Sequence, residues 1–191
     1  MTSETERPAH VLLAVSGSVA IHRGLDLVRE LDRHGVDVTV LMTEAACKLV
    51  RPLLFQAMTR RRVHHDLFSA EGEDPYDHLA READLMVFAP ATADLIGRLA
   101  AGLGDDVVTT TALAFSGPRI LAPAMNWRMW EHPFVQRNVG VLRDAGYRIV
   151  GPGEGDLACG ERGPGRLAEV EEILAAALEA LPGKPPRPGS H

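Results

Sequence analysis

Hydroxyl and glycine residues that could hold a phosphate stand directly beyond two apolar segments. Ser16, Gly17 and Ser18 lie where residues 10–16 meet a helical pattern. Thr43 takes the same place after the next apolar segment. Backbone N–H groups at a helix start point outward and the helix dipole favours an anion, so a phosphate fits there. Gly17 permits a tight turn and a close ligand. Because the sequence has neither GxGxxG nor a P-loop lysine here, a plain turn stays open as the alternative.

A third group of small and polar residues follows the apolar segment 85–89. Pro90, Ala91 and Ala93 would let a flat ring approach the backbone. Thr92 and Asp94 could then form hydrogen bonds with the heteroatoms of that ring. Asp94 could equally cap the helix that follows, and taken alone this simpler role is the better interpretation.

The segment PAMNWRMW, residues 123–130, is hard to explain by packing alone. Methionine and tryptophan side chains surround a single amide, Asn126, directly after an apolar strand pattern. An amide at the carboxyl end of a strand is well placed to bind a polar group of a substrate. The alternative is a corner of the hydrophobic core.

Residues 151–166 read GPGEGDLACGERGPGR and predict a mobile loop that could close over a site. A linker is the alternative, but a linker would not need Leu157, Ala158 and Cys159 in its middle. His78 is expected to stand before the helix that leads into the third strand. Lone histidines are more often surface or satisfied core residues, so the residues alone do not assign His78 to a site.

These segments predict an α/β fold with a single-domain, Rossmann-like (flavodoxin-like) open parallel sheet and helices on both faces. Strand and helix patterns alternate along the chain, and a strand–helix–strand order implies a parallel sheet with right-handed crossovers. The predicted domain is 9–181, between a flexible N-terminus, 1–8, and a disordered tail, 182–191. The expected later elements are strands at 85–89, 119–122 and 147–150 and helices at 94–101, 107–115, 127–145 and 169–181.

Composition narrows the function classes. A formal net charge of -6 over 191 residues argues against a nucleic-acid partner, which would need a basic face. No apolar run approaches the roughly 20 residues that span a bilayer, and the polar start is not a secretory signal. Cys47 and Cys159 fit no disulfide framework, and no histidine or cysteine spacing indicates zinc. We expect a cytoplasmic protein without a metal.

Taken together, the segments resemble the flavin-dependent cysteine decarboxylases, a family of homo-oligomeric flavoproteins. The resemblance is greatest to bacterial phosphopantothenoylcysteine decarboxylase, the decarboxylase half of the bifunctional coenzyme A biosynthesis protein. It extends from about Val11 to Glu172. Its carriers are His78 and the segments APATADL (89–95), AGLGDD (101–106), PAMNWRMW (123–130) and GDLACGERGPGR (155–166).

The resemblance implies an FMN cofactor and a role for each motif. His78 would be the active-site base, Asn126 would bind the substrate carboxylate, and Cys159 would lie on a flap over the substrate. Met125, Met129 and Ala158 would line the substrate. The residues implied to lie against FMN are Gly17, Ser18, Thr43, Pro90, Ala91, Thr92 and Asp94. Asp94 departs from the relatives that carry Asn there. Family members are typically trimers, or dodecamers built of trimers, with the flavin between subunits.

The implied reaction is an oxidative decarboxylation of a terminal cysteine. A saturated cysteine carboxylate has no electron sink, so hydride transfer from its β-carbon to FMN, with loss of the thiol proton, first gives a thioaldehyde. Loss of CO2 then leaves an ene-thiolate. The substrate would be 4′-phosphopantothenoylcysteine or the C-terminal cysteine of a ribosomally made peptide. Cys159 lies in the sequence LACG, which favours 4′-phosphopantothenoylcysteine. The sequence contains no ligase domain, so a peptide substrate stays open.

Two other functions are compatible with the same fold. A flavin prenyltransferase would share the small-residue flavin loop, but the PAMNWRMW and LACG segments argue against it. A non-catalytic flavin-binding or regulatory subunit would be expected to have a broken site, yet His78, Asn126 and Cys159 are all present.

Overall fold

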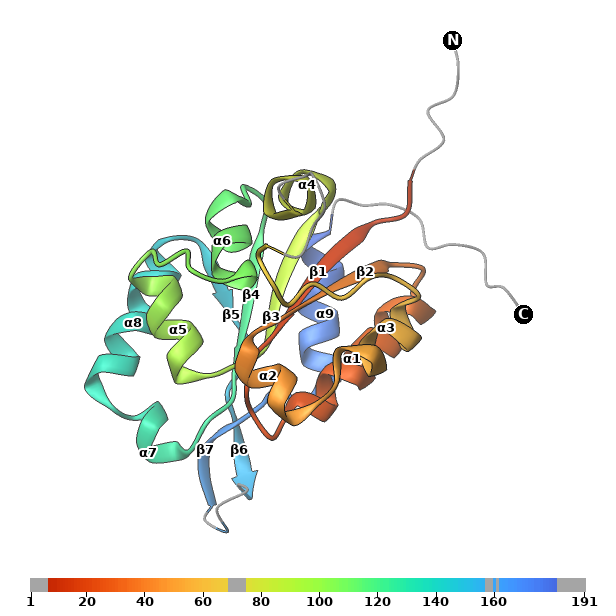
Figure 1. The fold of residues 1–191 in the computed structure, drawn as a ribbon. Helices are drawn as coiled ribbons and strands as arrows, with labels where there is room; N and C mark the ends of the chain where they lie inside the picture. The colour runs from red at the N-terminus through yellow and green to blue at the C-terminus, as the bar shows by residue number, and fades with distance from the viewer. Residues whose placement is uncertain (1–6, 69–74, 157–159, 161, 182–191) are drawn as a thin grey trace.

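The computed structural model describes residues 7–68, 75–156, 160 and 162–181. Its centre is a five-stranded parallel sheet in the order β2-β1-β3-β4-β5 (Figure 1). The strands are β1 His10–Val15, β2 Asp37–Met42, β3 Leu85–Ala91, β4 Arg119–Pro123 and β5 Tyr147–Ile149. This is the strand order of flavodoxin-like sheets, so the predicted fold is confirmed. Successive strands are added towards one edge of the sheet up to β2 and towards the other edge from β3 onwards, so the strand order reverses between β1 and β3.

Burial on both faces explains why β1 and β3 read as continuous apolar runs, since every residue in both strands is buried. Successive side chains of a strand point to opposite faces. Val11, Leu13 and Val15 therefore join one core cluster, whereas Leu12 and Ala14 join the other.

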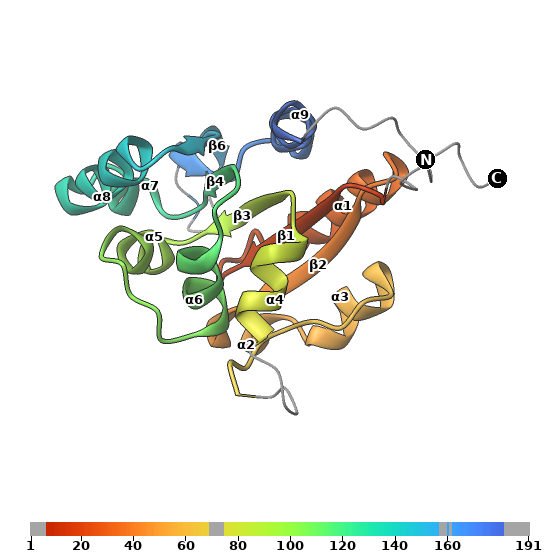
Figure 2. The ribbon, with the colours of Figure 1, turned by 90° about the horizontal axis from the view of Figure 1, so that it is seen from above.

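Helices cover the two faces unequally (Figure 2). One core cluster contains residues of α1 Ile21–Arg33, α3 Pro52–Thr59 and α9 Val170–Ala180. The other contains residues of α4 Pro75–Glu82, α5 Ala93–Ala100, α6 Val107–Ala114 and α8 Pro133–Asp144. The short helices α2 Glu44–Leu49 and α7 Trp127–Trp130 follow β2 and β4. Within the described residues, none of the helices is long and apolar enough to cross a membrane.

Several predicted boundaries were wrong. The single helix expected over 127–145 is two helices, because His132 caps α8 through a bond from the Phe134 N–H and Pro133 occupies the first helical turn. The third strand continues through Pro90 to Ala91. His78 lies inside α4 rather than before a helix.

The glycine-rich segment also differs from the loop that was expected. Its described part forms an antiparallel pair, β6 Gly153–Asp156 and β7 Arg162–Arg166, separate from the main sheet. In Figure 1 this pair projects from the end of the sheet where α7 lies.

At the amino ends of the strands, polar side chains bind one another. The His10 ring shares a hydrogen bond with Thr39, with 2.8 Å between Nε2 and Oγ1. The Asp84 carboxylate accepts a hydrogen bond from the His10 backbone N–H at 2.8 Å. It also forms a bidentate ion pair with the Arg7 guanidinium, with both N–O distances 2.8 Å. Burial, and secondarily the charge of Arg61, lowers the pKa of His10.

Candidate functional site

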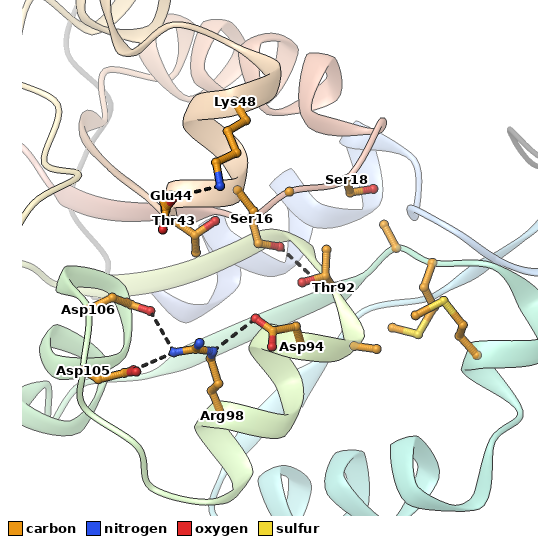
Figure 3. Close-up of a pocket in the computed structure, with 16 residues that line it drawn as sticks. Ser16, Ser18, Thr43, Glu44, Lys48, Thr92, Asp94, Arg98, Asp105 and Asp106 are labelled. Carbon is orange, nitrogen blue, oxygen red and sulfur yellow. Dashed lines mark hydrogen bonds and ion pairs between the residues drawn. The ribbon is translucent and has the colours of Figure 1, made fainter.

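A cleft of about 610 Å³ lies beyond the carboxyl ends of the strands (Figure 3). Its walls are the segments that follow β1, β2, β3 and β4, together with the start of α6. Open α/β sheets bind their ligands at this edge, where the chain order reverses between β1 and β3. Seven predicted site residues line the cleft: Gly17, Ser18, Thr43, Thr92, Asp94, Met125 and Met129.

Ser16 joins the ends of β1 and β3. Its hydroxyl donates to the Pro90 carbonyl at 2.7 Å and accepts from the Thr92 N–H at 3.0 Å. The Ser16 N–H also donates to Pro90 at 3.2 Å. Because the side chain is buried, these bonds fix the relative position of the two loops that line the cleft. Pro90 and Ala91 are themselves buried in β3 and do not line the cleft.

Gly17 allows the first and second loops to touch. A Cβ at this position would lie 2.6 Å from the Ala45 Cβ and 3.1 Å from its carbonyl carbon. A contact this short would move α2 away from the β1 loop. The glycine predicted for a tight turn therefore serves a close approach between two loops.

The start of α1 differs from the other helix starts at the cleft. Its N-cap, Ala20, provides no side-chain acceptor, and the Ile21 and Arg23 N–H groups donate instead to the backbone carbonyls of Ser18 and Ala20, at 3.0 and 2.9 Å. Thr43, Thr92, Asp106 and Asn126 each cap their own helix through a side-chain oxygen. The helix dipole would favour an anion at the start of α1, where no side-chain oxygen caps the helix.

Thr92, rather than Asp94, caps α5. Its Oγ1 accepts from the Leu95 N–H at 3.3 Å, and Thr43 Oγ1 accepts from the Ala46 N–H at 3.2 Å. Each hydroxyl also carries a proton that it can donate to a ligand. The predicted cap role of Asp94 is wrong, because Asp94 lies in the first turn of the helix, where its carboxylate pairs with Arg98.

Arg98 is surrounded by three carboxylates, which sequence reasoning missed. Its guanidinium lies 3.2 Å from Asp94, 2.6 Å from Asp105 and 3.7 Å from Asp106 (Figure 3). The hydrogen bond to Asp105 raises the pKa of Arg98 above its ordinary value. Glu44 forms a second pair with Lys48 at 2.7 Å. The i,i+4 spacing of Asp94 with Arg98 and of Glu44 with Lys48 was the available signal.

Asn126 lies at the turn between β4 and α7, next to the cleft residue Met125, but it is not itself among the residues that line the cleft. Its Oδ1 accepts from the Arg128 N–H at 2.8 Å, which orients the amide. The Met125 N–H donates to the Gly165 carbonyl of β7 at 2.9 Å. The β6–β7 pair therefore lies directly against the Asn126 turn.

His78 is not part of the cleft of its own chain. Its side chain is 58% exposed on α4, with Nε2 3.4 Å from the Glu82 carboxylate, and it is absent from the cleft lining. Burial lowers the pKa of His64, and the charges of Arg62, His65 and His78 lower it further. His78 thus lies near His64, which pairs with Leu41 close to the carboxyl end of β2. Ala158 and Cys159 lie outside the described residues.

Comparisons with known proteins agree with the fold and the motifs. The sequence profile of a family described as Flavoprotein matches residues 1–181. The chain is 47% identical over 170 residues to the coenzyme A biosynthesis bifunctional protein CoaBC of Bacillus subtilis (strain 168), a match that covers 88% of this chain and 42% of that protein. It is 39% identical over 175 residues to a probable phosphopantothenoylcysteine decarboxylase of Streptococcus mutans, covering 90% of this chain and 98% of the relative. The chain thus spans less than half the length of the bifunctional relative.

Solved structures of similar fold include decarboxylases as well. One is a mutant PPC decarboxylase complexed with pantothenoylaminoethenethiol, with a TM-score of 0.79, 30% identity and coverage of 90% of this chain and 97% of that one. Another is the FMN-dependent cysteine decarboxylase SpaF, with a TM-score of 0.76, 33% identity and coverage of 88% and 97%. These likenesses confirm the predicted Rossmann-like fold.

Proposed function

Because the chain belongs to the flavoprotein family, we propose that it binds FMN and decarboxylates the terminal cysteine of its substrate. The observation that carries this proposal is the cleft at the reversal between β1 and β3, with the hydroxyls of Ser18, Thr43 and Thr92 on its walls. Flavodoxin-like sheets hold FMN at this same place.

The residues of the cleft fit the cofactor. The phosphate would bind at the start of α1, where the helix dipole favours an anion and no side-chain oxygen caps the helix. Gly17 brings the β1 and β2 loops into contact, and Ala93 and Ala124 provide small side chains on the wall that a flat ring would face. Thr43 and Thr92 can donate their hydroxyl protons while capping their helices.

When bound, FMN supplies an acceptor for the hydride that leaves the β-carbon of the substrate cysteine. Asn126 orients the carboxylate by donating from its amide, whose Oδ1 is already held by the Arg128 N–H. This is an effect of geometry and not of charge. His78 takes up a proton as general base, the role for which enzymes use histidine most often. The substrate thereby becomes a thioaldehyde and, after losing CO2, an ene-thiolate.

The position of His78 favours a shared active site. Its side chain is exposed on α4 and lies outside the cleft lining of its own chain. We therefore propose a homo-oligomer, a trimer or a dodecamer of trimers, in which α4 of one copy faces the cleft of another. Co-expression of a His78→Asn chain with an Asn126→Ala chain tests this, because mixed oligomers would contain some intact sites. Recovered turnover is expected, and inactive mixtures of confirmed mixed oligomers would contradict sharing.

The proposed substrate is 4′-phosphopantothenoylcysteine, because the relatives at 39–47% identity carry names from coenzyme A biosynthesis. A peptide that ends in cysteine is the second candidate, since the FMN-dependent cysteine decarboxylase TvaF from thioviridamide biosynthesis is 31% identical with a TM-score of 0.77. The cytoplasmic location stays a prediction.

Mass spectrometry of flavin-loaded protein incubated with each substrate is the decisive test. A loss of about 44 mass units would mark a saturated product, and a loss of about 46 an ene-thiol. Unchanged substrate in both incubations would contradict decarboxylation and favour a flavin-binding subunit. A prenyl adduct on flavin in a further incubation with a prenyl phosphate, which would lose phosphate in the transfer, would instead favour a flavin prenyltransferase.

Cys159 is proposed to help return electrons to the ene-thiol and so to set the product. Cys159→Ser should shift the product towards the ene-thiol. Cys47→Ser is the matched control, because burial raises the pKa of the Cys47 thiol and so disfavours its reactive thiolate. An identical product distribution in the wild-type protein and Cys159→Ser would contradict the role.

A further inference from the structure

Two glycines of β7 present a face without side chains to the turn that carries Asn126. Gly163 and Gly165 are two residues apart on the strand, and Gly165 is the residue without a partner at the register shift between β6 and β7. Both lie against residues 125–127, at the junction of β4 and α7.

Gly165 is required by both space and backbone conformation. A Cβ there would overlap the Met125 carbonyl oxygen, and it would lie 3.2 Å from the Trp127 nitrogen and 3.3 Å from the Asn126 carbonyl carbon. These are backbone atoms, which cannot rotate aside as a side chain can. The φ angle of +137° is also one that residues with a side chain rarely adopt.

Gly163 makes a milder version of the same contact. A Cβ there would lie 3.0 Å from the Trp127 Cβ and 3.1 Å from its Cγ. These atoms are the base of the Trp127 side chain, so Trp127 would have to move by a few tenths of an ångström. A side chain at position 165 should therefore displace the turn more than one at position 163, and the two substitutions can be compared in one experiment.

We infer that Gly163 and Gly165 are positioning residues that hold Asn126 in place for the substrate carboxylate. The turn is held from both sides, because the Ala124 N–H donates to Ala91 of β3 at 3.0 Å and the Met125 N–H donates to Gly165 at 2.9 Å. A side chain on β7 would push the turn away from one of these anchors. This inference rests on the role of Asn126 in the proposed function.

The variants Gly165→Ala and Gly163→Ala test the inference. Gly165→Ala should lower kcat/KM by roughly 10²-fold, the cost of misplacing a positioned group by about 1 Å, and Gly163→Ala should lower it less. Flavin content should not change. Gly140→Ala is the control for an added methyl group in open space, and Gly146→Ala, with φ of +87° and no atom near the new Cβ, is the control for backbone strain.

A double-mutant cycle separates positioning from general damage. If β7 acts through Asn126, Gly165→Ala should cause no further loss of residual activity in an Asn126→Ala protein. The same fold loss in both backgrounds would overturn the inference. Should Gly165→Ala not fold, the milder Gly163→Ala carries the cycle.

An optical readout keeps this inference distinct from the proposed function. Both tryptophans of the chain, Trp127 and Trp130, lie on α7, so intrinsic emission reports the position of the turn. Gly165→Ala and Gly163→Ala should shift this emission, whereas Gly146→Ala should not. Absence of CO2 release by the wild-type protein would overturn the proposed function alone. Unchanged emission in both β7 variants would overturn the inference, whatever the activity.

Discussion

The two ends of the central sheet both carry polar side chains, but those side chains have different partners. At the amino ends, His10 binds Thr39 and Arg7 binds Asp84, so side chains satisfy one another. At the carboxyl ends, Thr43 and Thr92 bind backbone N–H groups of helix starts around a cleft. A polar residue at a strand end therefore indicates a site only when it lies at a helix start that a ligand can also reach.

The largest expected effect is at His78. It tests whether catalysis in the cleft at the carboxyl ends of the strands depends on a residue that does not line that cleft. His78→Asn should lower turnover by about 10²–10⁴-fold, the usual value of a general base. FMN should stay bound and stability should hold, because the side chain is exposed. CO2 release and flavin absorbance measure the two effects.

Tyr76→Phe is the matched control for His78, since Tyr76 lies two residues earlier on α4. Full activity in His78→Asn together with loss in Tyr76→Phe would move the role of the base to Tyr76. Full activity in both variants would remove α4 from the mechanism.

The second effect concerns FMN affinity. Gly17→Ala places a methyl group 2.6 Å from the Ala45 Cβ, and overpacking of this kind costs about 1–3 kcal/mol. If the two loops separate, FMN should bind roughly 10–100-fold more weakly, as measured by flavin fluorescence titration. Gly24→Ala in α1, where the new Cβ would make ordinary contacts from 3.4 Å, should bind normally. Equal affinities in the two variants would show that loop contact does not shape the cleft.

The third effect belongs to the amino end and should leave the cleft untouched. Thr39→Val removes one hydrogen-bond partner of the buried His10 ring and should lower the free energy of unfolding by about 1–3 kcal/mol. Chemical denaturation measures this loss, and flavin titration should show unchanged affinity. Weakened FMN binding would mean that the two ends are coupled.

The fourth effect is a pH dependence from the same histidine. Burial lowers the pKa of His10 in the folded protein below its ordinary 6.5, so the unfolded chain binds more protons as the pH falls. The contribution of neutral His10 to the free energy of unfolding is therefore fully present above about pH 6.5 and is lost as the pH falls below that value. The half-buried His64, whose pKa is also lowered by burial, contributes in the same direction. The difference between the wild-type protein and His10→Gln in unfolding free energy across this range isolates His10, and a constant difference would contradict its titration.

The smallest effect is expected at Arg7. Its side chain is 51% exposed, and exposed ion pairs contribute less than about 1 kcal/mol. Arg7→Ala should therefore change the midpoint of denaturation only slightly. A loss as large as that of Thr39→Val would show that the pair with Asp84 also secures the His10 backbone.

Sequence patterns predicted the sheet well because β1 and β3 are buried on both faces and read as continuous apolar runs. The break at Pro133 was visible in the sequence, since proline favours the first turn of a new helix. The β6–β7 pair was not visible, because the segment is rich in glycine and has no alternation of apolar residues.

Site residues next to a strand end were predicted better than those fixed by tertiary contacts. Ser18, Thr43 and Thr92 line the cleft as expected. The cluster of Arg98 with Asp105 depends on how the chain folds back between α5 and α6, which periodicity does not report. The location of His78 relative to the cleft depends on how α4 packs, and no local pattern encodes it.

The Arg98 cluster has a consequence for the ionic-strength dependence of cofactor binding. Four carboxylates but only two cations line the cleft within the described chain, and both cations are paired with carboxylates. A phosphate would therefore be held by short hydrogen bonds from N–H and O–H groups, and not by attraction to a net positive charge in the cleft. Added salt screens long-range attraction between charges and weakens such local bonds far less. The protein should thus retain its flavin through purification at high salt.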